Sequence, residues 1–385
     1  MKRRVFICAG EASGDHHGAA LVEAALRKDP GLEFFGLAGP AMRAAGVRAL
    51  VRVEDVAVAG LTEVLTSLPR LRRILSELTA ALDSERPDLL LPIDYPDFNL
   101  RLARRAKDRG LPVLYYVSPQ VWAWRRGRLR DIARVVDRMM VLFPFEEPLY
   151  REAGVPVTWV GHPLADAAGL RPERRAARER LGVPQGAPLV ALLPGSRPGE
   201  VARILPVLVQ AAHLLHAQDP ERRFVVPVAP TLDPALVARH TGVSPVRPLR
   251  DALADVLAAA DAAAVASGTA TLEVALAGVP MVIVYRLSPV TALIARRAIS
   301  VRDIGLANLV AGERVAEELV QEECTPRSVA RAIEALLDPL AAAAARASLA
   351  SVRERLGPAG ASDRAAAVLL DLLATRVEVP PRVSV

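Results

Sequence analysis

This chain of 385 residues has very little cysteine and no long apolar run. Its two cysteines, Cys8 and Cys324, lie far apart and neither has the spacing of a metal-ligand set, which predicts a reducing compartment rather than a disulfide framework. No stretch of about 18 uncharged apolar residues occurs, and the run at residues 5–10 stops at Glu11, too early for a secretory signal. We therefore expect a cytoplasmic protein without a membrane-spanning segment.

Lysine and aromatic residues are also scarce, although the formal net charge is +6. The only lysines are Lys2, Lys28 and Lys107, so arginine supplies almost all of the positive charge. Aromatic residues make up 4% and do not interleave with the arginines as in single-strand stacking platforms, so we expect no nucleic-acid partner. Arginine clusters that are either solvated helix faces or contacts for a phosphate or a lipid leaflet occur at residues 101–109, 125–130 and 171–180.

The length exceeds what one hydrophobic core usually serves, so we expect two domains. Apolar runs alternate with helical patterns up to about residue 165, which predicts a doubly wound parallel sheet. A polar stretch at 164–186 is a candidate hinge, and the pattern from residue 315 onward is mostly helical. The predicted strands are residues 5–9, 89–93, 111–117, 138–143, 157–161, 189–193, 262–265 and 282–285.

The most informative segment is residues 89–99, where a buried-strand pattern ends in two carboxylates and an amide. Ligands of open α/β sheets bind outside the carboxyl ends of the strands, which places Asp94 and Asp97 at such a site. Pro96 is expected to keep Tyr95 extended and to hold Asp97 in one orientation, as a general base requires. The alternative is that Asp94 or Asn99 caps a helix beginning near residue 100 and that Asp97 is a solvated loop acid.

Two further loops follow predicted strands of the first half. The turn at residues 10–15 lacks both G-x-G-x-x-G and the Gly-Lys-Ser/Thr of a P-loop, which excludes those two motifs. His16 and His17 point about 100° apart on a helix, so we expect no metal there. Trp122 and Trp124 stand beside arginines, and they either pack their loop or border a sugar or acyl group while an arginine binds a phosphate.

A loop at residues 194–200 has a composition that suits a phosphate. It follows a predicted strand and opens a helix, so Gly195 and Ser196 can present donors and Arg197 a charged fork. This geometry is moderately specific by itself.

A second phosphate-type loop lies at residues 266–273. Its small polar residues at a helix start suit a diphosphate, and Glu273, one turn into the helix, could accept from the hydroxyls of a ribose. The alternative is a capping box with Ser267 or Thr269 as the cap. Two such loops in one domain favour a nucleotide diphosphate.

Residues 61–75 carry apolar residues at helical spacing, with arginines at one end. Pro69 predicts a break or kink in this helix. The segment is either an ordinary core-facing helix or an element that lies in a membrane interface. Its candidate interface residues are Leu61, Val64, Leu65, Leu68, Leu71 and Leu75.

Eight motifs follow one another along the chain: GEASGDHHGA, IDYPDFN, YYVSPQVWAWRRGR, VGHPLAD, LLPGSRPGE, ASGTATLEVAL, PMVIVYR and NLVAGERVAEELVQEE. Together they resemble the lipid-A-disaccharide synthase family of inverting glycosyltransferases with the GT-B fold. The resemblance covers nearly the whole chain in family order, and IDYPDFN with SPQVWAW is highly specific. The chain departs from the family pattern at Ala307, where the family typically has proline.

The resemblance implies two Rossmann-like parallel-sheet domains that face each other across a cleft. Residues 1–165 would form the acceptor-binding domain, with helices of about 355–385 returning to it, and residues 166–354 the UDP-sugar-binding domain. It implies UDP-2,3-diacylglucosamine as donor and 2,3-diacylglucosamine 1-phosphate as acceptor, giving the β(1→6) lipid A disaccharide 1-phosphate and UDP. Because both substrates are acylated, it also implies peripheral attachment to the inner face of the inner membrane. No cofactor is expected, and the existence of a homodimer stays open.

In the mechanism that this resemblance suggests, Asp97 takes the proton of the acceptor 6-hydroxyl, with Asp94, Glu11 or His162 as alternative bases. No Asp-x-Asp signature is present, so we expect no metal ion at the leaving diphosphate. The residues expected to bind substrates are Glu11, Ser13, Gly14, Asp94, Asn99, Ser118, Gln120, Trp122, Arg125, Gly195, Ser196, Arg197, Glu200, Ser267, Gly268, Thr269, Glu273 and Asn308.

Two other interpretations stay open. A UDP-N-acetylglucosamine epimerase, or another UDP-sugar transferase with a soluble acceptor, would share the second-half loops but would not need the Trp122 loop or an interfacial helix. A non-catalytic nucleotide-sugar-binding or anionic-membrane scaffold would bind the UDP-sugar without forming a product.

Overall fold

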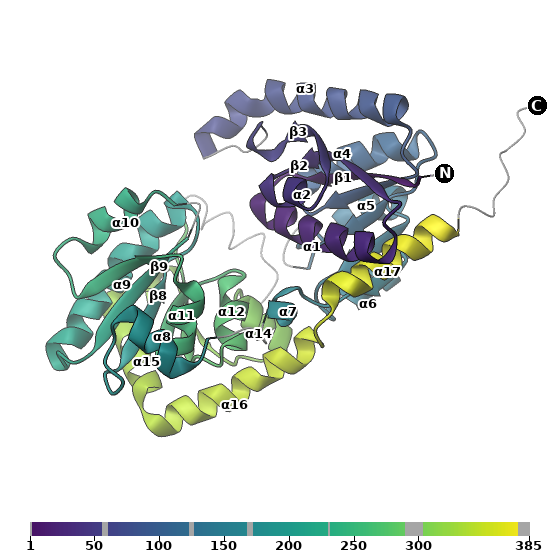
Figure 1. The fold of residues 1–385 in the computed structure, drawn as a ribbon. Helices are drawn as coiled ribbons and strands as arrows, with labels where there is room; N and C mark the ends of the chain where they lie inside the picture. The colour runs from purple at the N-terminus through teal and green to yellow at the C-terminus, as the bar shows by residue number, and fades with distance from the viewer. Residues whose placement is uncertain are drawn as a thin grey trace, which may run out of the picture. The chain divides into compact units, whose positions relative to one another are not determined.

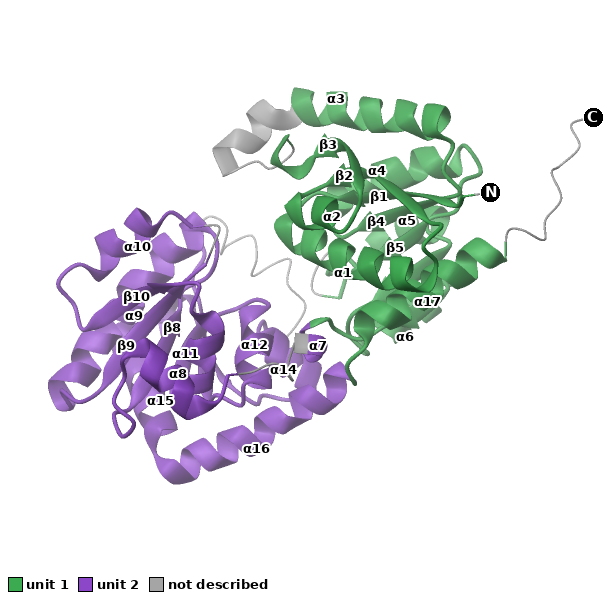
Figure 2. Cartoon of the chain, viewed as in Figure 1, with its two compact units in different colours: residues 1–163, 358–385 green, residues 164–357 purple. Residues whose placement is uncertain are grey.

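The structure is a computed structural model of the chain, and it describes residues 2–55, 61–122, 127–167, 172–229, 232–288 and 303–375, without the side chains of residues 61–68. The chain divides into two compact units (Figure 2). Unit 1 comprises Met1–Pro163 and Pro358–Val385, and unit 2 comprises Leu164–Gly357. Each unit has a parallel sheet of its own with helices packed on it (Figure 1).

Unit 1 alternates strands and helices. In chain order they are β1 (Arg4–Ala9), α1 (Ala12–Lys28), β2 (Glu33–Ala38), α2 (Pro40–Ala44), β3 (Arg48–Arg52), a 3₁₀ turn (Val53–Asp55), α3 (Leu61–Glu85), β4 (Leu89–Ile93), α4 (Pro96–Lys107), β5 (Leu114–Tyr116), α5 (Arg128–Val135), β6 (Arg138–Val141), α6 (Glu146–Glu152), β7 (Val157–Trp159) and, from the C-terminal part, α17 (Ala361–Ala374). The seven strands are ordered β3-β2-β1-β4-β5-β6-β7. The order reverses between β1 and β4, where open α/β sheets bind their ligands.

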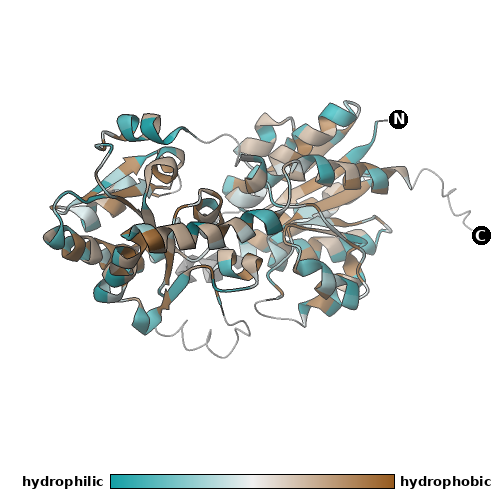
Figure 3. Cartoon of the chain, turned by 90° about the horizontal axis from the view of Figure 1, so that it is seen from below, coloured by the Kyte–Doolittle hydropathy of each residue, from teal (hydrophilic) through white to brown (hydrophobic). Residues whose placement is uncertain are grey.

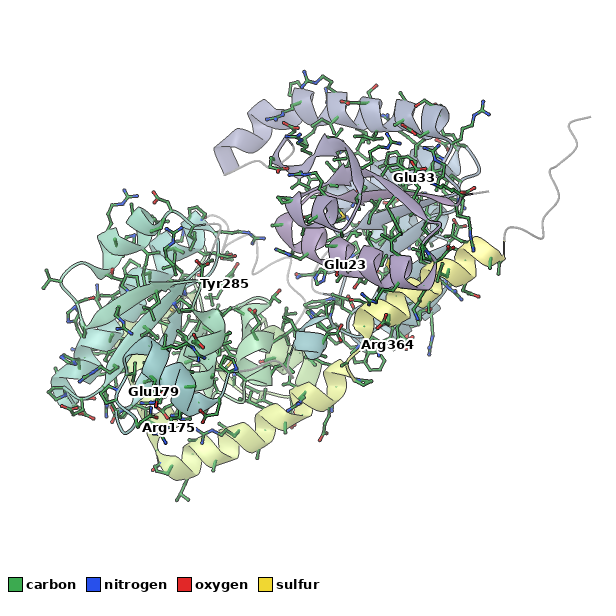
Figure 4. All side chains as sticks on the ribbon, viewed as in Figure 1. Glu23, Glu33, Arg175, Glu179, Tyr285 and Arg364 are labelled. Atoms are coloured by element: carbon green, nitrogen blue, oxygen red, sulfur yellow. The ribbon has the colours of Figure 1, made fainter. Side chains whose placement is uncertain are left out.

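The C-terminal helix α17 belongs to unit 1 and packs against α1. Its Arg364, labelled in Figure 4, donates to the backbone carbonyl of Val160 at 2.8 Å, just beyond β7. Arg27 of α1 pairs with Asp363 at 3.2 Å. These contacts fasten the last described helix to the first domain of the chain.

Unit 2 repeats the architecture. Its elements are α7 (Leu164–Ala167), α8 (Arg174–Leu181), β8 (Leu189–Leu193), α9 (Pro198–Gln218), β9 (Arg223–Val228), α10 (Pro234–Thr241), β10 (Val246–Arg250), α11 (Leu253–Ala259), β11 (Ala262–Ala266), α12 (Ala270–Leu276), β12 (Met281–Tyr285), α14 (Leu306–Ala311), β13 (Glu317–Val320), a 3₁₀ turn (Gln321–Glu323), α15 (Pro326–Leu337) and α16 (Pro339–Leu356). The six strands are ordered β10-β9-β8-β11-β12-β13, and the order reverses between β8 and β11.

The central strands explain why the sequence pattern predicts this fold. Every residue of β4, β8 and β11 is buried, because helices cover both faces of each sheet. Figure 3 shows these inner strands as largely hydrophobic, whereas hydrophilic residues lie on the outward sides of the helices. The predicted class of doubly wound parallel sheets is confirmed.

Five strands lack a distinctive sequence signal, and one of them lies where helix was expected. β2, β3, β9 and β10 were not singled out from the sequence. The segment after residue 315 is mostly helical as expected, except for the short strand β13, which pairs in parallel with β12. It has four residues at the edge of the sheet, of which two are buried, and so short an edge strand carries little periodicity.

The candidate hinge at residues 164–186 contains two helices rather than an open linker. The guanidinium of Arg178 on α8 is only 1% exposed, and it donates to the carbonyls of Pro184 at 2.9 Å and Ala259 at 2.9 Å and to that of Ala187. It also lies 3.4 Å from the carboxylate of Asp261. Arg178 therefore ties α8 to the segments that precede β8 and β11.

Helix α3 continues through Pro69, so the predicted break does not occur. Its second half faces the core of unit 1: Leu75 is 6% exposed, and Leu71 packs against the same cluster. This corrects the assignment of Leu75 to a membrane interface. The side chains of Leu61, Val64, Leu65 and Leu68 lie outside the described part of the chain.

Across the described ranges, no single helix combines the length and the apolar character needed to cross a membrane. One bent pair, Pro326–Leu337 with Pro339–Ala374, meets that test by length and composition alone.

Replacing Arg178 by Met should lower the free energy of unfolding by about 3 kcal/mol, because it removes the buried donor to the carbonyls of Pro184, Ala187 and Ala259. Asp261 keeps Arg174 and the Leu189 N–H as partners. Arg175, which lies on the same helix and contacts Glu179 at 3.2 Å (Figure 4), is the matched control. The exposed ion pair of Arg175 with Glu179 contributes little to stability, so Arg175→Met should change the free energy of unfolding by less than about 0.5 kcal/mol. Urea denaturation measures both variants, and equal midpoints would contradict the assigned role of Arg178.

Candidate functional site

The turn between β4 and α4 is the most unusual backbone in unit 1. Asp94 and Tyr95 both have left-handed φ values, 45° and 48°. The expected extended conformation of Tyr95 is therefore wrong, because α4 begins at Pro96 and Tyr95 is its N-cap. The Tyr95 ring lies directly over Gly10, where a side chain would collide with it. Such strain costs about 1–3 kcal/mol per residue and is typical of functional sites.

Asn99 supports this turn through hydrogen bonds to backbone carbonyls. Its buried amide nitrogen lies 3.2 Å from the carbonyl of Cys8, 3.1 Å from that of Ile93 and 2.7 Å from that of Asp94. Tyr115 of β5 adds a hydroxyl bond of 2.6 Å to the Asp94 carbonyl. The amide nitrogen thus fastens the ends of β1 and β4 together. The buried amide oxygen of Asn99 has no hydrogen-bond partner among the described residues, and the role of Asn99 in substrate binding stays a prediction.

Asp97 lies in the first turn of α4, and its side chain is 73% exposed. One of its oxygens pairs with the guanidinium of Arg128 at the start of α5, which is only 14% exposed. The arginine orients the carboxylate, while the exposure of Asp97 leaves it accessible to a molecule arriving from solvent. Asp94, at the carboxyl end of the neighbouring strand, is half-buried.

At the start of α1, the N-cap Glu11 and Ser13 are exposed, whereas Gly14 and Asp15 are buried. The sequence did not single out Asp15, which accepts from the backbone N–H groups of Gly39 at 2.9 Å, Ala41 at 2.8 Å and Met42 at 3.1 Å. Its carboxylate therefore caps α2 from a neighbouring segment.

The loop after β5 carries Ser118, Gln120 and Trp122. The Ser118 hydroxyl is buried and lies 2.7 Å from the hydroxyl of Tyr150, whereas Gln120 is exposed. Trp122 is buried and meets the Phe145 ring edge-on, with centroids 5.5 Å apart, so it packs the loop. Trp124 and Arg125 lie outside the described residues.

Two neutral imidazoles lie near this loop. The rings of His17 and His162 are 6.0 Å apart, and His162 also packs on Phe143. Burial lowers the pKa of His17 to about 4 and the pKa of His162 to about 3, in each case with repulsion from a neighbouring histidine. A group of such low basicity is a poor proton acceptor, which weakens His162 as an alternative base.

In unit 2, the carboxylate of Glu200 contacts the backbone of the loop between β8 and α9. The carboxylate of Glu200 lies 3.3 Å from the backbone nitrogen of Ser196 and 3.4 Å from that of Arg197, and it pairs with the Arg197 guanidinium at 3.4 Å. Gly195 has φ 108°, and a Cβ there would lie 2.5 Å from Glu200. Glu200 thus occupies the donors predicted for a phosphate, and its direct role in substrate binding stays a prediction.

The loop between β11 and α12 leaves donors available. Among the described residues, the backbone N–H groups of Gly268, Thr269 and Ala270 have no acceptor. Thr269 is exposed and makes no side-chain cap, so the predicted capping box does not form. Glu273 lies one turn into α12, and burial raises its pKa.

A buried network holds this loop in place. Ser267 donates its hydroxyl to the carbonyl of Ile304 at 2.8 Å, and the backbone nitrogen of Ile304 donates to Glu318 at 2.9 Å. Asn308 donates to Glu318 at 2.8 Å and to the Ala316 carbonyl at 2.9 Å, and its oxygen accepts two backbone N–H groups. Ser267 and Asn308 therefore support the loop through internal hydrogen bonds, and their assignment as substrate contacts stays a prediction.

In the described part of the chain, no group of three or more His, Cys, Asp or Glu side chains is arranged to hold a metal ion. The candidate site residues lie in two separate sets of loops, one at the carboxyl edge of each sheet. In unit 1 it presents Glu11, Ser13, Asp94, Asp97 and Gln120. In unit 2 it presents Arg197, the loop at residues 268–270 and Glu273.

The chain matches a family model described as lipid-A-disaccharide synthetase over residues 5–368. Curated relatives named lipid-A-disaccharide synthase include that of Geobacter metallireducens, 49% identical over 374 residues, covering 96% of this chain and 97% of the relative. That of Geobacter sulfurreducens is 48% identical over 377 residues, covering 97% and 98%.

Solved structures share the fold at low sequence identity. A putative UDP-N-acetylglucosamine 2-epimerase from Listeria monocytogenes gives a TM-score of 0.66 at 13% identity, covering 100% of this chain and 99% of that one. A calicheamicin glycosyltransferase gives 0.64 at 18% identity, covering 98% and 100%. The predicted GT-B class, with its two Rossmann-like units, is thereby confirmed.

The buried network around Asn308 predicts that its removal destabilises unit 2. Asn308→Ala would remove the acceptor of the Ala316 N–H and the donor to the Ala316 carbonyl, at a cost of about 3 kcal/mol in unfolding free energy, although the Val315 N–H keeps the Glu313 carbonyl and Glu318 keeps the Gly305 N–H. Thr269→Ala, which removes an exposed hydroxyl, should change the free energy of unfolding by less than about 0.5 kcal/mol. Denaturant unfolding and hydrogen exchange at residues 304–318 check this, and unchanged exchange in Asn308→Ala would contradict it.

Proposed function

The chain belongs to the lipid-A-disaccharide synthase family, and from that premise we propose that it transfers the sugar of UDP-2,3-diacylglucosamine to 2,3-diacylglucosamine 1-phosphate. The products are the β(1→6)-linked lipid A disaccharide 1-phosphate and UDP. The observation that carries the proposal is the family match across nearly the whole chain. The reactive loops at the carboxyl edges of two parallel sheets support it, because such edges bind ligands in this fold class.

The donor's diphosphate binds to unit 2. The free N–H groups of residues 268–270 converge with the start of α12, and Arg197, whose side chain is 74% exposed, can turn from Glu200 to a phosphate. Glu273 accepts from the ribose hydroxyls. Since UDP leaves as an anion, these donors stabilise charge that develops in the transition state.

Asp97 in unit 1 acts as the general base. It removes the proton of the acceptor 6-hydroxyl as this oxygen attacks the anomeric carbon from the face opposite UDP, which inverts the configuration. Arg128 fixes the direction of the carboxylate, and the strained turn at Asp94 and Tyr95 fixes the start of α4. Asp94 and Glu11, at the same sheet edge, bind sugar hydroxyls or serve as the alternative base.

Both substrates carry acyl chains, so we place the enzyme on the inner face of the inner membrane. The first half of α3 is the contact, through Leu61, Val64, Leu65 and Leu68, while the second half is held by the core. Leu75 takes no part because it is buried.

The alternatives have less support. Epimerases share the fold with this chain, but the family match and the relatives at 45–49% identity carry the synthase name. A scaffold without activity would bind UDP-sugar and release no UDP, which the following assay distinguishes.

The purified protein should convert the two acylated sugars to the disaccharide 1-phosphate and UDP, detected by mass spectrometry. Asp97→Asn should lower the turnover about 10²–10⁴-fold, the usual contribution of a general base, and leave the affinity for UDP unchanged. Asp131→Asn, which removes an exposed acid that pairs with Arg104 on α4, is the control and should retain the turnover. Near-normal activity of Asp97→Asn would move the base to Asp94 or Glu11.

Membrane attachment through α3 predicts that the protein cosediments with vesicles of phosphatidylglycerol and phosphatidylethanolamine. Replacing Val64, Leu65 and Leu68 together by Ser should remove most of the bound fraction, because each apolar side chain contributes to burial in the interface. Leu340→Ser, at an apolar residue of α16 that is 83% exposed, should bind as the parent does. Unchanged binding of the triple variant would place the membrane contact elsewhere.

A further inference from the structure

Arg128 lies on the face of α5 that packs against the core of unit 1. Ile132 and Val135, one and two turns further along, share this face and are buried. The side chain of Arg128 is 14% exposed, whereas that of Arg134 on the same helix is 76% exposed. Arg128 is therefore not part of a solvated helix face, which is one of the two interpretations of the arginine cluster at residues 125–130.

A guanidinium in such a place requires an anionic partner, because a buried charge without one is costly. Among the described residues, the acceptor of its donors is one oxygen of Asp97, which pairs with Nη2 of Arg128. A guanidinium presents several N–H donors in a planar fork that matches the oxygens of a phosphate. Within the same residues the other donors of Arg128 have no acceptor, so the fork can receive a second anion.

Arg128 lies beside the turn that carries the proposed base. Burial and the charge of Asp94 raise the pKa of Tyr115, and the positive charge of Arg128 opposes that rise. The Tyr115 hydroxyl donates to the Asp94 carbonyl at 2.6 Å, so the guanidinium is close to the carboxyl end of β4. Glu11, Asp94 and Asp97 give this sheet edge three acids, and Arg128 pairs with one of them. These acids would repel an anionic substrate unless a cation receives its charge.

We propose that Arg128 binds the phosphate of the acceptor, which takes the place of Asp97 at the guanidinium. The inference rests on the proposed function, in which the acceptor is 2,3-diacylglucosamine 1-phosphate. The 1-phosphate and the 6-hydroxyl of that sugar are carried on the two sides of the ring oxygen, so two neighbouring protein groups can hold them. Arg128 sets the direction of the carboxylate before the acceptor arrives. Once the phosphate has bound, the released oxygen of Asp97 accepts from the 6-hydroxyl.

The positions of the two side chains favour this exchange. Asp97 is exposed and can turn into solvent, and an ion pair with so exposed a partner contributes little. Ile132 and Val135 keep α5 in the core, so the carboxylate moves and the arginine stays. A phosphate can engage two nitrogens of the fork, whereas Asp97 engages one. Recognition of the acceptor and release of the base are thereby one event.

The test is a comparison of dissociation constants in detergent micelles for two probes, 2,3-diacylglucosamine 1-phosphate and 2,3-diacylglucosamine without the phosphate. The parent should bind the phosphorylated probe about 10–100-fold more tightly, as hydrogen bonds to a charged group imply. Arg128→Gln should reduce this ratio to about threefold or less, because it removes the charge and the fork. Arg134→Gln, on the exposed face of the same helix, is the matched control and should keep the ratio of the parent.

A second variant leaves Arg128 in place. In Asp97→Asn the carboxylate no longer competes for the guanidinium, so the phosphorylated probe should bind about two- to tenfold more tightly than to the parent. Binding of the probe without the phosphate should not change. In the Arg128→Gln background, Asp97→Asn should give no such gain, whereas a merely structural role of Arg128 predicts no gain in either background.

The same phosphate ratio in Arg128→Gln as in the parent would overturn the inference, as would a gain in Asp97→Asn that persists without Arg128. Phosphatidylglycerol that displaces the phosphorylated probe at a similar concentration would assign the guanidinium to a lipid headgroup and would also overturn it. Failure of the parent to form any disaccharide would instead refute the proposed function, and the binding ratios would still decide whether Arg128 recognises a sugar phosphate.

Discussion

The parallel pairing of the two central strands in each sheet is the constraint on which the rest of the molecule depends. β1 and β4 run side by side from Val5 opposite Leu89 to Ala9 opposite Ile93, so the segments that leave them emerge at one edge. The Asn99 amide then locks the two strand ends together. In unit 2 the pairing of β8 with β11 does the same for the two loops rich in glycine and small polar residues.

Many polar residues of the motifs bind the chain's own backbone rather than a ligand. Asp15 and Asn308 use their polar atoms, and Asn99 its amide nitrogen, to bond N–H and carbonyl groups that the loops would otherwise leave buried and unpaired. Their role is to define the shape of the loops, while the exposed Asp97 and Arg197 are the side chains that remain accessible. A site built in this way has rigid supports and few mobile contacts.

The sequence predicts the architecture well because buried parallel strands are apolar throughout and are followed by turns and helices. It predicts which loops matter, but not what each polar residue in them does. A carboxylate or amide after a strand has the same pattern whether it meets a substrate, as proposed for Asp97, or a carbonyl, as Asn99 does.

The Glu200 side chain gives the β8–α9 loop an anion of its own. Its oxygens occupy the positions that a phosphate would otherwise take at the N–H groups of Ser196 and Arg197. Any phosphate that enters must therefore displace a tethered carboxylate, so that association becomes an exchange of one negative group for another. Because Glu200 already bonds the backbone nitrogens of this loop, binding of a phosphate there would require little further ordering of the loop.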